Sequence, residues 1–370
     1  MTHVQEFLRA HGLDELRERY SIMTKRHGLH DNLVLLKYNQ IESPMGEPVV
    51  QECRGIILDQ ADDWRIVSFP YRKFFNHGEG HAAPIEWSTA RVLEKLDGSL
   101  MTLYWYANDW HVSTSGTPDA DSGVWGEGMT FGSLFWETWD RMGWMRPESE
   151  GVESGYSYMF ELCCPENRVV VPHTERRLLL HGARNLVTLA EENHREVAHR
   201  YGWDYARSWP LMTIDQCVSA ADALDPMQTE GFVVVDGRFN RLKIKSPKYV
   251  AIHHAKDGLS RKRFVDLARN GEESEFLAYF PQLRAEFDAI ASEVAAWSER
   301  IEADFARHRG IETQKDYAMA VKDTPYSAAL FLLRAGKIAT ARDWFKKATL
   351  PAVLRLLGVP DEDEPKQEAA

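Results

Sequence analysis

A short lysine motif is the part of this sequence that points most directly to chemistry. Lys95-Leu96-Asp97-Gly98 stands in a stretch rich in branched and aromatic residues. An unprotonated lysine amine can attack phosphorus and hold a nucleotide as a phosphoramide. The same four letters describe many surface turns, so the motif taken alone favours a solvated turn lysine.

Two downstream lysines and a carboxylate favour the chemical interpretation. Lys243 lies thirteen positions after Glu230, and Lys245 follows it. Residues two apart on a strand face the same side, so the two lysines would present their ammonium groups to one cleft. Like charges and partial burial both lower a lysine pKa, which would help Lys95 to become unprotonated. The same charges would neutralise a phosphate as it becomes five-coordinate.

Two carboxylates and a glycine suit the rest of a nucleotide. Glu161 and Glu230 stand on predicted strands and could hold ribose hydroxyls or a hydrated Mg²⁺. Gly98 would let the backbone approach phosphates without a Cβ in the way. The alternative for Glu161 is a buried acid paired with Arg168 or Arg177.

Cationic and aromatic residues upstream complete the candidate set. Arg54 and Lys73 suit the outer phosphates of a nucleotide. Phe75 or Tyr38 would line the base pocket. The neighbouring Phe74 is predicted to be a core residue.

This ordered set resembles the covalent nucleotidyltransferases, the superfamily of ATP-dependent ligases and mRNA capping enzymes, and most of all the phage RNA ligase 1 family. The resemblance implies that Lys95 is the adenylated lysine. It implies nucleotide-binding roles for Tyr38, Arg54, Lys73, Phe75, Asp97, Gly98, Glu161, Glu230, Lys243 and Lys245. It also implies ATP as co-substrate and Mg²⁺, replaceable by Mn²⁺, with Glu161, Glu230 and Glu275 as metal ligands.

One segment departs from the family pattern. The family shows lysines before a Gly-Ser pair in the hairpin after the nucleophile, whereas this chain reads Ser113-Thr114-Ser115-Gly116-Thr117. Ser115 can donate a hydrogen bond but cannot neutralise phosphate. Either another cation compensates or triphosphate binding is altered.

Charge and composition bound the class of protein. The net charge of −12 argues against a nucleic-acid partner at first, but residues 238–263 carry nine Lys or Arg against one acid. Such a local basic surface can bind phosphates while the remainder keeps the chain soluble. The start lacks a secretory pattern, no apolar run approaches the roughly 20 residues of a membrane span, and four cysteines fit reduced thiols. We therefore expect a cytoplasmic protein, within the host cell if phage-encoded.

Hydrophobic patterning predicts the elements that position these residues. We expect strands at residues 33–38, 55–58, 91–94, 100–106, 110–114, 156–162, 169–171, 178–181, 231–235 and 241–244, with helices at 5–20 and 130–142. The turn signal Asp236-Gly237 predicts that the last two strands form a hairpin. From about residue 255 the pattern becomes helical, and residues 283–308 place apolar residues three or four apart.

These patterns predict an α+β fold with two domains. Residues 1–250 would form an adenylyltransferase (nucleotidyltransferase) domain of antiparallel sheets with flanking helices. Residues 251–370 would form an all-helical C-terminal domain that selects the RNA. We expect a monomer without a membrane partner.

The resemblance implies an ATP-dependent RNA ligase that joins 5′-phosphate and 3′-hydroxyl RNA ends through lysyl-AMP and adenylylated RNA. The substrate would be broken RNA, such as a nicked tRNA. One alternative is another covalent nucleotidyltransferase, either a DNA ligase or a capping guanylyltransferase. These enzymes usually append a strand-rich domain, which the helical tail disfavours. A second alternative is a non-catalytic RNA-binding protein on the same scaffold.

Overall fold

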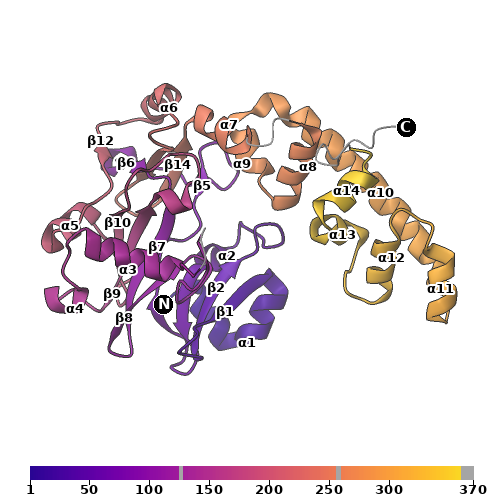
Figure 1. Ribbon diagram of the computed structural model, residues 1–370, viewed down its shortest axis with the longest axis horizontal. Coiled ribbons are helices and arrows are strands. Elements are labelled where there is room, and N and C mark those ends of the chain that lie inside the picture. Colours follow the sequence, from indigo (N-terminus) through magenta and orange to yellow (C-terminus); the bar gives the residue numbers. More distant parts are fainter. Residues whose placement is uncertain (125–127, 256–259, 360–370) are drawn as a thin grey trace. The chain divides into compact units, whose positions relative to one another are not determined.

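The computed structural model describes residues 1–124, 128–255 and 260–359, except the side chains of residues 254, 255, 275, 279 and 282. The chain divides into two compact units, Met1–His253 and His254–Ala370. The first unit combines sheets with helices, and the described part of the second contains helices and no strand (Figure 1). The predicted α+β fold with a helical C-terminal part is confirmed. Among the described residues, no helix has both the length and the apolar character needed to cross a bilayer.

The first unit begins with a helix and continues with groups of strands that are separated by short helices. Its helices are α1 His3–Tyr20, α2 Pro48–Glu52, α3 Phe131–Arg141, α4 Pro147–Glu150, α5 His194–Tyr201 and α6 Ile214–Ala223, and α7 Pro247–Ala255 contains the boundary. Its strands are β1 Ile22–Arg26, β2 Leu33–Tyr38, β3 Arg54–Asp59, β4 Arg65–Ser68, β5 Phe75–Asn76, β6 Arg91–Lys95, β7 Ser99–Tyr106, β8 Asp109–Thr114, β9 Tyr156–Cys163, β10 Arg177–Asn185, β11 Glu191–Glu192, β12 Ser208–Trp209, β13 Gly231–Val235 and β14 Arg241–Lys245.

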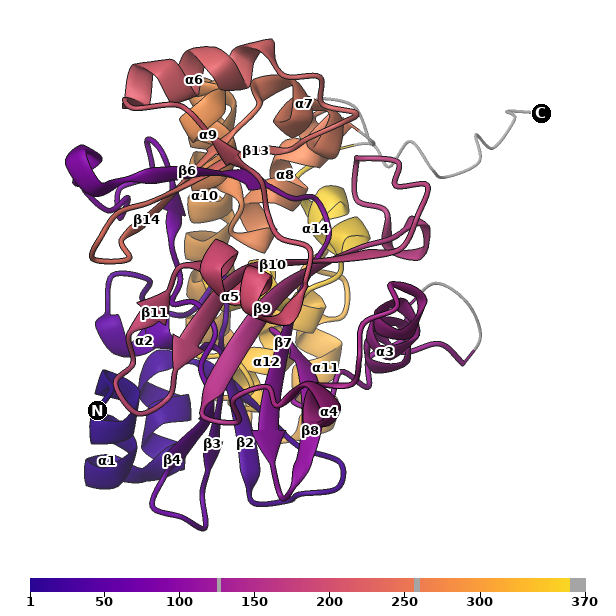
Figure 2. The same cartoon turned by 90° about the vertical axis from the view of Figure 1, so that its left-hand side faces the viewer.

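The described strands form three sheets. Their orders are β1-β2-β3-β4, β11-β10-β9-β7-β8 and β12-β6-β13-β14-β5. Every named pair is antiparallel except β14 with β5. Figure 2 shows β6 and β13 side by side, and β13 lies between the strand of the lysine motif and β14, which carries the downstream lysines.

The lysine motif is followed by a hairpin that packs on an aromatic core. β7 and β8 pair as predicted, with Trp105 opposite Trp110. The sheet that contains them packs against α3, where Phe135 and Trp139 are fully buried against Phe160 of β9. This core supports the strand that leads away from the lysine motif.

The β13–β14 hairpin is also confirmed, although its connection is longer than a two-residue turn. Asp236 accepts hydrogen bonds from the backbone N–H groups of Arg238 and Asn240, each at 2.9 Å. Phe239 adopts a left-handed backbone with φ of 62°. The carboxylate therefore organises the whole connection from Asp236 to Asn240.

The predicted strand at residues 169–171 is wrong, since these residues form a bend. The backbone N–H groups of Val170 and Val171 donate to Asp97 Oδ2 at 2.9 and 2.7 Å. A neighbouring strand would have required those same donors. The branched side chains signal burial here, and both valines are buried.

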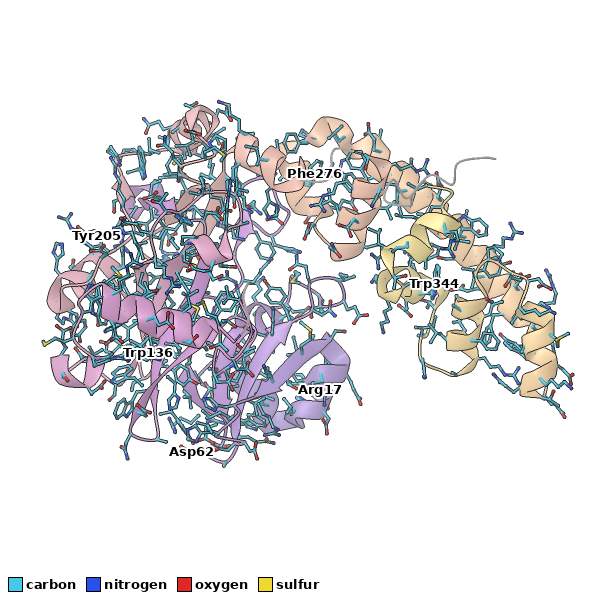
Figure 3. All side chains as sticks on the ribbon, viewed as in Figure 1. Arg17, Asp62, Trp136, Tyr205, Phe276 and Trp344 are labelled. Atoms are coloured by element: carbon cyan, nitrogen blue, oxygen red, sulfur yellow. The ribbon has the colours of Figure 1, made fainter. Side chains whose placement is uncertain are left out.

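The second unit has its own apolar core. Its helices are α8 Arg261–Asn270, α9 Glu273–Tyr279, α10 Arg284–His308, α11 Gln314–Val321, α12 Ser327–Arg334, α13 Ala341–Lys347 and α14 Leu350–Leu356. Phe276 and Trp344, labelled in Figure 3, belong to this core. The predicted long helix is α10, and Phe287, Ile290 and Ile301 on its apolar face are buried.

The close pairing of β13 with β14 predicts that Gly231 cannot be replaced. Its φ is +153°, and an added Cβ would lie 2.2 Å from Ile244 O and 2.7 Å from Lys245 Cα. We expect Gly231→Ala to destabilise the protein by at least about 1–3 kcal/mol, because strained backbone adds to the clash. The urea midpoint of unfolding measures this. Gly80→Ala is the matched control, since an added Cβ there meets nothing within 4 Å. Equal midpoints for the two variants would contradict the prediction.

Candidate active site

Three neighbouring strands bring Lys95, Glu230 and Lys245 together. Gly231, which begins β13, lies opposite Lys95 of β6 on one side and opposite Lys245 of β14 on the other. Glu230, the residue before it, reaches both lysines. Its carboxylate lies 2.5 Å from Lys95 Nζ and 3.2 Å from Lys245 Nζ. We call these three residues the lysine–glutamate triad.

The triad depends on a buried carboxylate. The side chain of Glu230 is only 6% exposed. Burial acts to raise the pKa of Glu230, but the ammonium groups of Lys95 and then Lys245 outweigh burial, and the pKa lies below its usual value. Glu230 is therefore charged at neutral pH and fixes both amines at the edge of a cavity.

A cavity of about 260 Å³ adjoins Lys95 and is called the lysine cavity below. Its lining residues are Arg54, Tyr71, Phe74, Leu93, Glu94, Lys95, Leu96, Gly98, Leu100, Glu161, His181, Val233, Arg241, Lys243 and Lys245. Six predicted site residues are among them: Arg54, Lys95, Gly98, Glu161, Lys243 and Lys245. The volume is close to the lower end of the roughly 300–1,000 Å³ of ligand pockets.

Lys243 and Lys245 line this cavity together, as their spacing predicted. Only Lys245 shares Glu230 with Lys95, whereas the Lys243 ammonium lies 5.1 Å from the centre of the Phe74 ring. The Arg54 guanidinium lies at the same distance from that ring. Phe74 is thus a half-buried ring between two cations, and the prediction that it belongs to the core is wrong.

Glu161 has a partner that the sequence patterns did not reveal. His181 Nε2 lies 3.3 Å from Glu161 Oε2, while Arg177 pairs with Asp204. Tyr71 donates a hydrogen bond to His181 O and lies 3.0 Å from His181 Nδ1.

A bulge in β10 turns His181 into the lysine cavity. The register of β10 with β9 shifts between Leu180 and Gly182. A Cβ on Gly182 would lie 1.9 Å from Tyr71 Oη. An isolated glycine inside a strand pattern signals a bulge, so Gly182 was the available clue to His181.

The lysine motif is held in place by Asp97. Its buried carboxylate accepts hydrogen bonds from Val170 N, Val171 N and, at 2.8 Å, from Tyr249 Oη. These contacts tie the turn after Lys95 to two other segments, and a nucleotide contact for Asp97 stays a prediction. Tyr249 is buried behind it, and burial raises the pKa of its hydroxyl.

Gly98 allows a close approach of backbone to β9. A Cβ at this position would lie 2.5 Å from Leu162 O and 3.1 Å from Glu161 Cγ. Any larger residue would therefore displace the strand that carries Glu161. Gly98 also lines the lysine cavity, where the approach of a phosphate remains a prediction.

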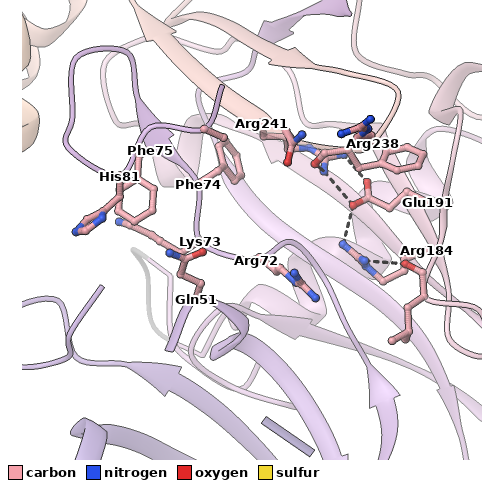
Figure 4. A pocket seen from close by; sticks show the side chains of 14 residues that line it. Gln51, Arg72, Lys73, Phe74, Phe75, His81, Arg184, Glu191, Arg238 and Arg241 are labelled. Atoms are coloured by element: carbon pink, nitrogen blue, oxygen red, sulfur yellow. Dashed lines mark hydrogen bonds and ion pairs between the residues drawn. The ribbon is translucent and has the colours of Figure 1, made fainter. Parts of the chain in front are cut away.

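A second cavity, of about 330 Å³, contains two other predicted residues and is called the arginine cavity below (Figure 4). It is lined by Gln51, Arg72, Lys73, Phe74, Phe75, His81, Ala83, Arg184, Leu189, Glu191, Arg238, Phe239, Asn240 and Arg241. Lys73 and Phe75 are here rather than in the lining of the lysine cavity. The Lys73 ammonium lies 5.2 Å from the ring centre of Tyr38 and 5.4 Å from that of Phe75.

The loop that contains Ser115 has a cation from another strand beside it. An ideal Cβ on Gly116 would lie 3.4 Å from Lys37 Nζ, and Lys37 of β2 pairs in register with Arg54. Gly55 permits this packing, since a Cβ there would lie 3.0 Å from Ser115 Cα. Lys37 thus brings a positive charge to the loop that contains Ser115.

The predicted metal ligands do not form a site by themselves. Glu161 faces His181, Glu230 pairs with two lysines, and the side chain of Glu275 lies outside the described residues. Within the described ranges, no group of three or more His, Cys, Asp or Glu side chains is arranged to hold a metal ion.

The chain matches one protein-family model and is similar in sequence to two viral proteins described here. A family model described as RNA ligase matches residues 52–249. An RNA ligase of Rhodothermus phage RM378 is 26% identical over 336 residues, which cover 74% of this chain and 75% of that protein. A protein of Autographa californica nuclear polyhedrosis virus, whose name combines polynucleotide kinase with RNA ligase, is 25% identical over 378 residues. The match covers 96% of this chain but only 53% of that protein, so the chain spans about half of its length.

Solved structures resemble the chain more distantly. An archaeal ATP-dependent RNA ligase has a TM-score of 0.44 at 13% identity, with 77% of this chain and 82% of the other covered. A Naegleria gruberi RNA ligase variant with ATP and Mn has a TM-score of 0.35 at 16% identity, with 45% and 51% covered.

The lowered pKa of Glu230 predicts a pH-dependent stabilisation. Because the folded-state pKa is lowered, the ion pairs contribute fully above the usual pKa of 4.5, and this contribution is lost as the pH falls through the lowered value. At neutral pH we expect Glu230→Gln to cost about 3–5 kcal/mol, since it leaves two partly buried ammonium groups without their carboxylate. The cost shrinks in acid.

Urea unfolding of both proteins at neutral pH and near pH ~3 measures the difference. Glu148→Gln is the control, because Glu148 is exposed. A cost of Glu230→Gln that is the same at both pH values would contradict the assigned ion pairs.

Proposed function

The chain belongs to the RNA ligase family, whose model matches more than half of it, and we propose that it seals RNA ends by ATP-dependent ligation through a covalent lysyl-AMP. The observation that carries this proposal is the lysine–glutamate triad at the edge of a cavity. Lys95, the residue that the family resemblance assigns as nucleophile, lies beside Lys245, with Lys243 in the same lining.

The ion pair between Lys95 and Glu230 must open before Lys95 can attack ATP. An ammonium group in contact with Glu230 has no lone pair with which to attack phosphorus. We propose that ribose hydroxyls of ATP take over the Glu230 carboxylate, so that Lys95 separates from it and loses a proton to solvent. Lys243 and Lys245 then act on the nucleotide by neutralising its α-phosphate.

The first covalent step then follows. Lys95 Nζ attacks the α-phosphorus of ATP, an N–P bond forms, and the bond to the bridging oxygen breaks. Pyrophosphate leaves with the electron pair. Arg54, which lines the cavity with its guanidinium over Phe74, is suited to the outer phosphates.

Two transfers complete the reaction. An RNA 5′-phosphate takes AMP from Lys95 and becomes an adenylylated 5′-5′ pyrophosphate end. A 3′-hydroxyl then attacks the RNA phosphorus and displaces AMP, which leaves a phosphodiester bond.

A divalent cation fits this site only together with the nucleotide. Mg²⁺ is held in such sites by one or two carboxylates and by substrate phosphates. Glu94 and Glu161 are the carboxylates that line the lysine cavity, and Glu161 is the one predicted to contribute. The cation would offset phosphate charge and orient the leaving group. Mn²⁺ would substitute for it.

The substrate and cellular setting extend the proposal. Nicked tRNA, or other single-stranded RNA with 5′-phosphate and 3′-hydroxyl ends, would be the substrate, and the helical second unit would help to select it. The monomer would act in the cytoplasm of a host cell. A DNA ligase or capping enzyme is disfavoured because no strand occurs in the described part of the second unit.

Covalent labelling tests the proposal against a non-catalytic RNA-binding role. Wild-type protein incubated with α-labelled ATP and Mg²⁺ should retain AMP, and Lys95→Ala should retain none. Lys243→Ala and Lys245→Ala should fold normally yet lose most of the adduct, because the α-phosphate loses its cations.

Arg195→Ala, at an exposed position on α5, is the control and should label fully. Absence of any adduct in the wild type would contradict enzymatic function. Wild-type labelling of both lysine variants would remove their assigned role.

A further inference from the structure

The arginine cavity carries a large excess of positive charge. Its lining includes five cationic residues, Arg72, Lys73, Arg184, Arg238 and Arg241, against one carboxylate, Glu191. All of the residues that line this cavity belong to the first unit. A concave surface with this balance attracts anions, and arginine favours phosphate through paired N–H donors.

The carboxylate in this cavity is already occupied. Glu191 Oε1 lies 2.6 Å from Arg184 Nη2 and 2.9 Å from Arg241 Nη1, and Glu191 Oε2 also pairs with Arg241 (Figure 4). All three residues are at least nine-tenths buried. This packed group forms the floor of the cavity. Of the other cations in the lining, Arg72 pairs with Glu52 at 2.8 Å, whereas no ion pair among the described residues engages Lys73 or Arg238.

One buried donor in this floor lacks a protein acceptor. Arg184 donates through one terminal nitrogen to Leu189 O at 2.9 Å and through the other to Glu191. Its Nε is buried and has no hydrogen-bond partner among the described residues. A buried N–H without an acceptor is costly, and a ligand oxygen or a water would satisfy it.

The arginine cavity adjoins the lysine cavity. Phe74 and Arg241 line both, whereas Lys95, Lys243 and Lys245 line only the lysine cavity. The Arg241 guanidinium is fixed by Glu191 and lies 4.1 Å from the centre of the Tyr71 ring. A ligand in the arginine cavity would therefore contact Phe74 and Arg241, which separate it from the cavity where Lys95 would carry AMP.

We infer that the arginine cavity binds the 5′-phosphate end of the RNA that receives AMP. The inference rests on the proposed ligase function, because an adenylate on Lys95 needs a phosphate acceptor in an adjoining site. Lys73, which the sequence predicted at the outer phosphates of a nucleotide, would instead contact the terminal phosphate of the RNA together with Arg238.

The transfer that this site serves is balanced without a further reactant. An oxygen of the RNA 5′-phosphate attacks the phosphorus of lysyl-AMP, and a P–O bond forms while the N–P bond to Lys95 breaks. The amine leaves with the electron pair and takes a proton from solvent. The resulting ammonium returns to Glu230.

Arg238→Ala is the variant that tests this assignment. Arg238 is exposed, and it follows Gly237 in the connection between β13 and β14. The substitution should leave the fold intact, which circular dichroism and thermal unfolding check. Arg195→Ala is the matched control, since it removes the same charge from an exposed helix position of the first unit that lines neither cavity.

Three separate assays locate the defect. We expect Arg238→Ala to form lysyl-AMP at the wild-type rate and to transfer AMP to 5′-phosphorylated RNA roughly tenfold more slowly. Sealing of RNA supplied already adenylylated reports the third step. Binding of a 5′-phosphorylated oligonucleotide over its 5′-hydroxyl counterpart, measured without ATP, should be lost in the variant and retained in Arg195→Ala.

The outcomes separate the possible uses of the cavity. A defect in lysyl-AMP formation as large as the defect in transfer would assign the cavity to the triphosphate of ATP and overturn the inference. Wild-type transfer and wild-type discrimination between the oligonucleotides would also overturn it. Failure of wild-type protein to form lysyl-AMP would instead refute the proposed function, and the binding assay would still test the cavity.

Discussion

The structure of this site depends on one buried charge, the carboxylate of Glu230, shared between two lysines from neighbouring strands. A buried carboxylate without cations would be costly, so Lys95 and Lys245 stabilise it and are in turn fixed by it. The arrangement requires β6, β13 and β14 to pair in one register, and Gly231 allows the strands to approach at that point. The pairing of these three strands therefore also sets the position of Lys95.

The triad would also make the release of Lys95 depend on the binding of a nucleotide to Glu230. In the free protein, Lys95 Nζ is held 2.5 Å from the Glu230 carboxylate. A nucleotide that engages Glu230 would release the amine where Lys243 and Lys245 can meet the phosphate. Asp97 holds the turn after Lys95 to Val170, Val171 and Tyr249, which would keep the backbone in place when the side chain leaves Glu230.

Much of the fold followed from local patterns. The β13–β14 hairpin, the β7–β8 hairpin and the apolar face of α10 each depend on neighbours close in sequence, and all were confirmed. The segment at residues 169–171 was predicted wrongly because its backbone donors serve Asp97, more than seventy positions away. Propensity describes side chains well but does not reveal such distant acceptors.

The sequence predicted several residues of the candidate site but not how these residues pair with one another. Spacing placed Lys243 and Lys245 on one face, but it could not show that Glu230 joins Lys95 to only one of them. His181 was missed because a bulge, and not strand alternation, turns it toward Glu161. The division between the lysine and arginine cavities was equally hidden, since both are assembled from segments distant in the chain.

Peptide mapping by mass spectrometry, after incubation of the protein with ATP and Mg²⁺, tests the central claim most directly. The account predicts AMP on the nitrogen of Lys95 and on no other side chain. AMP attached to a different residue, or a peptide containing Lys95 that stays unmodified under conditions that support ligation, would contradict it.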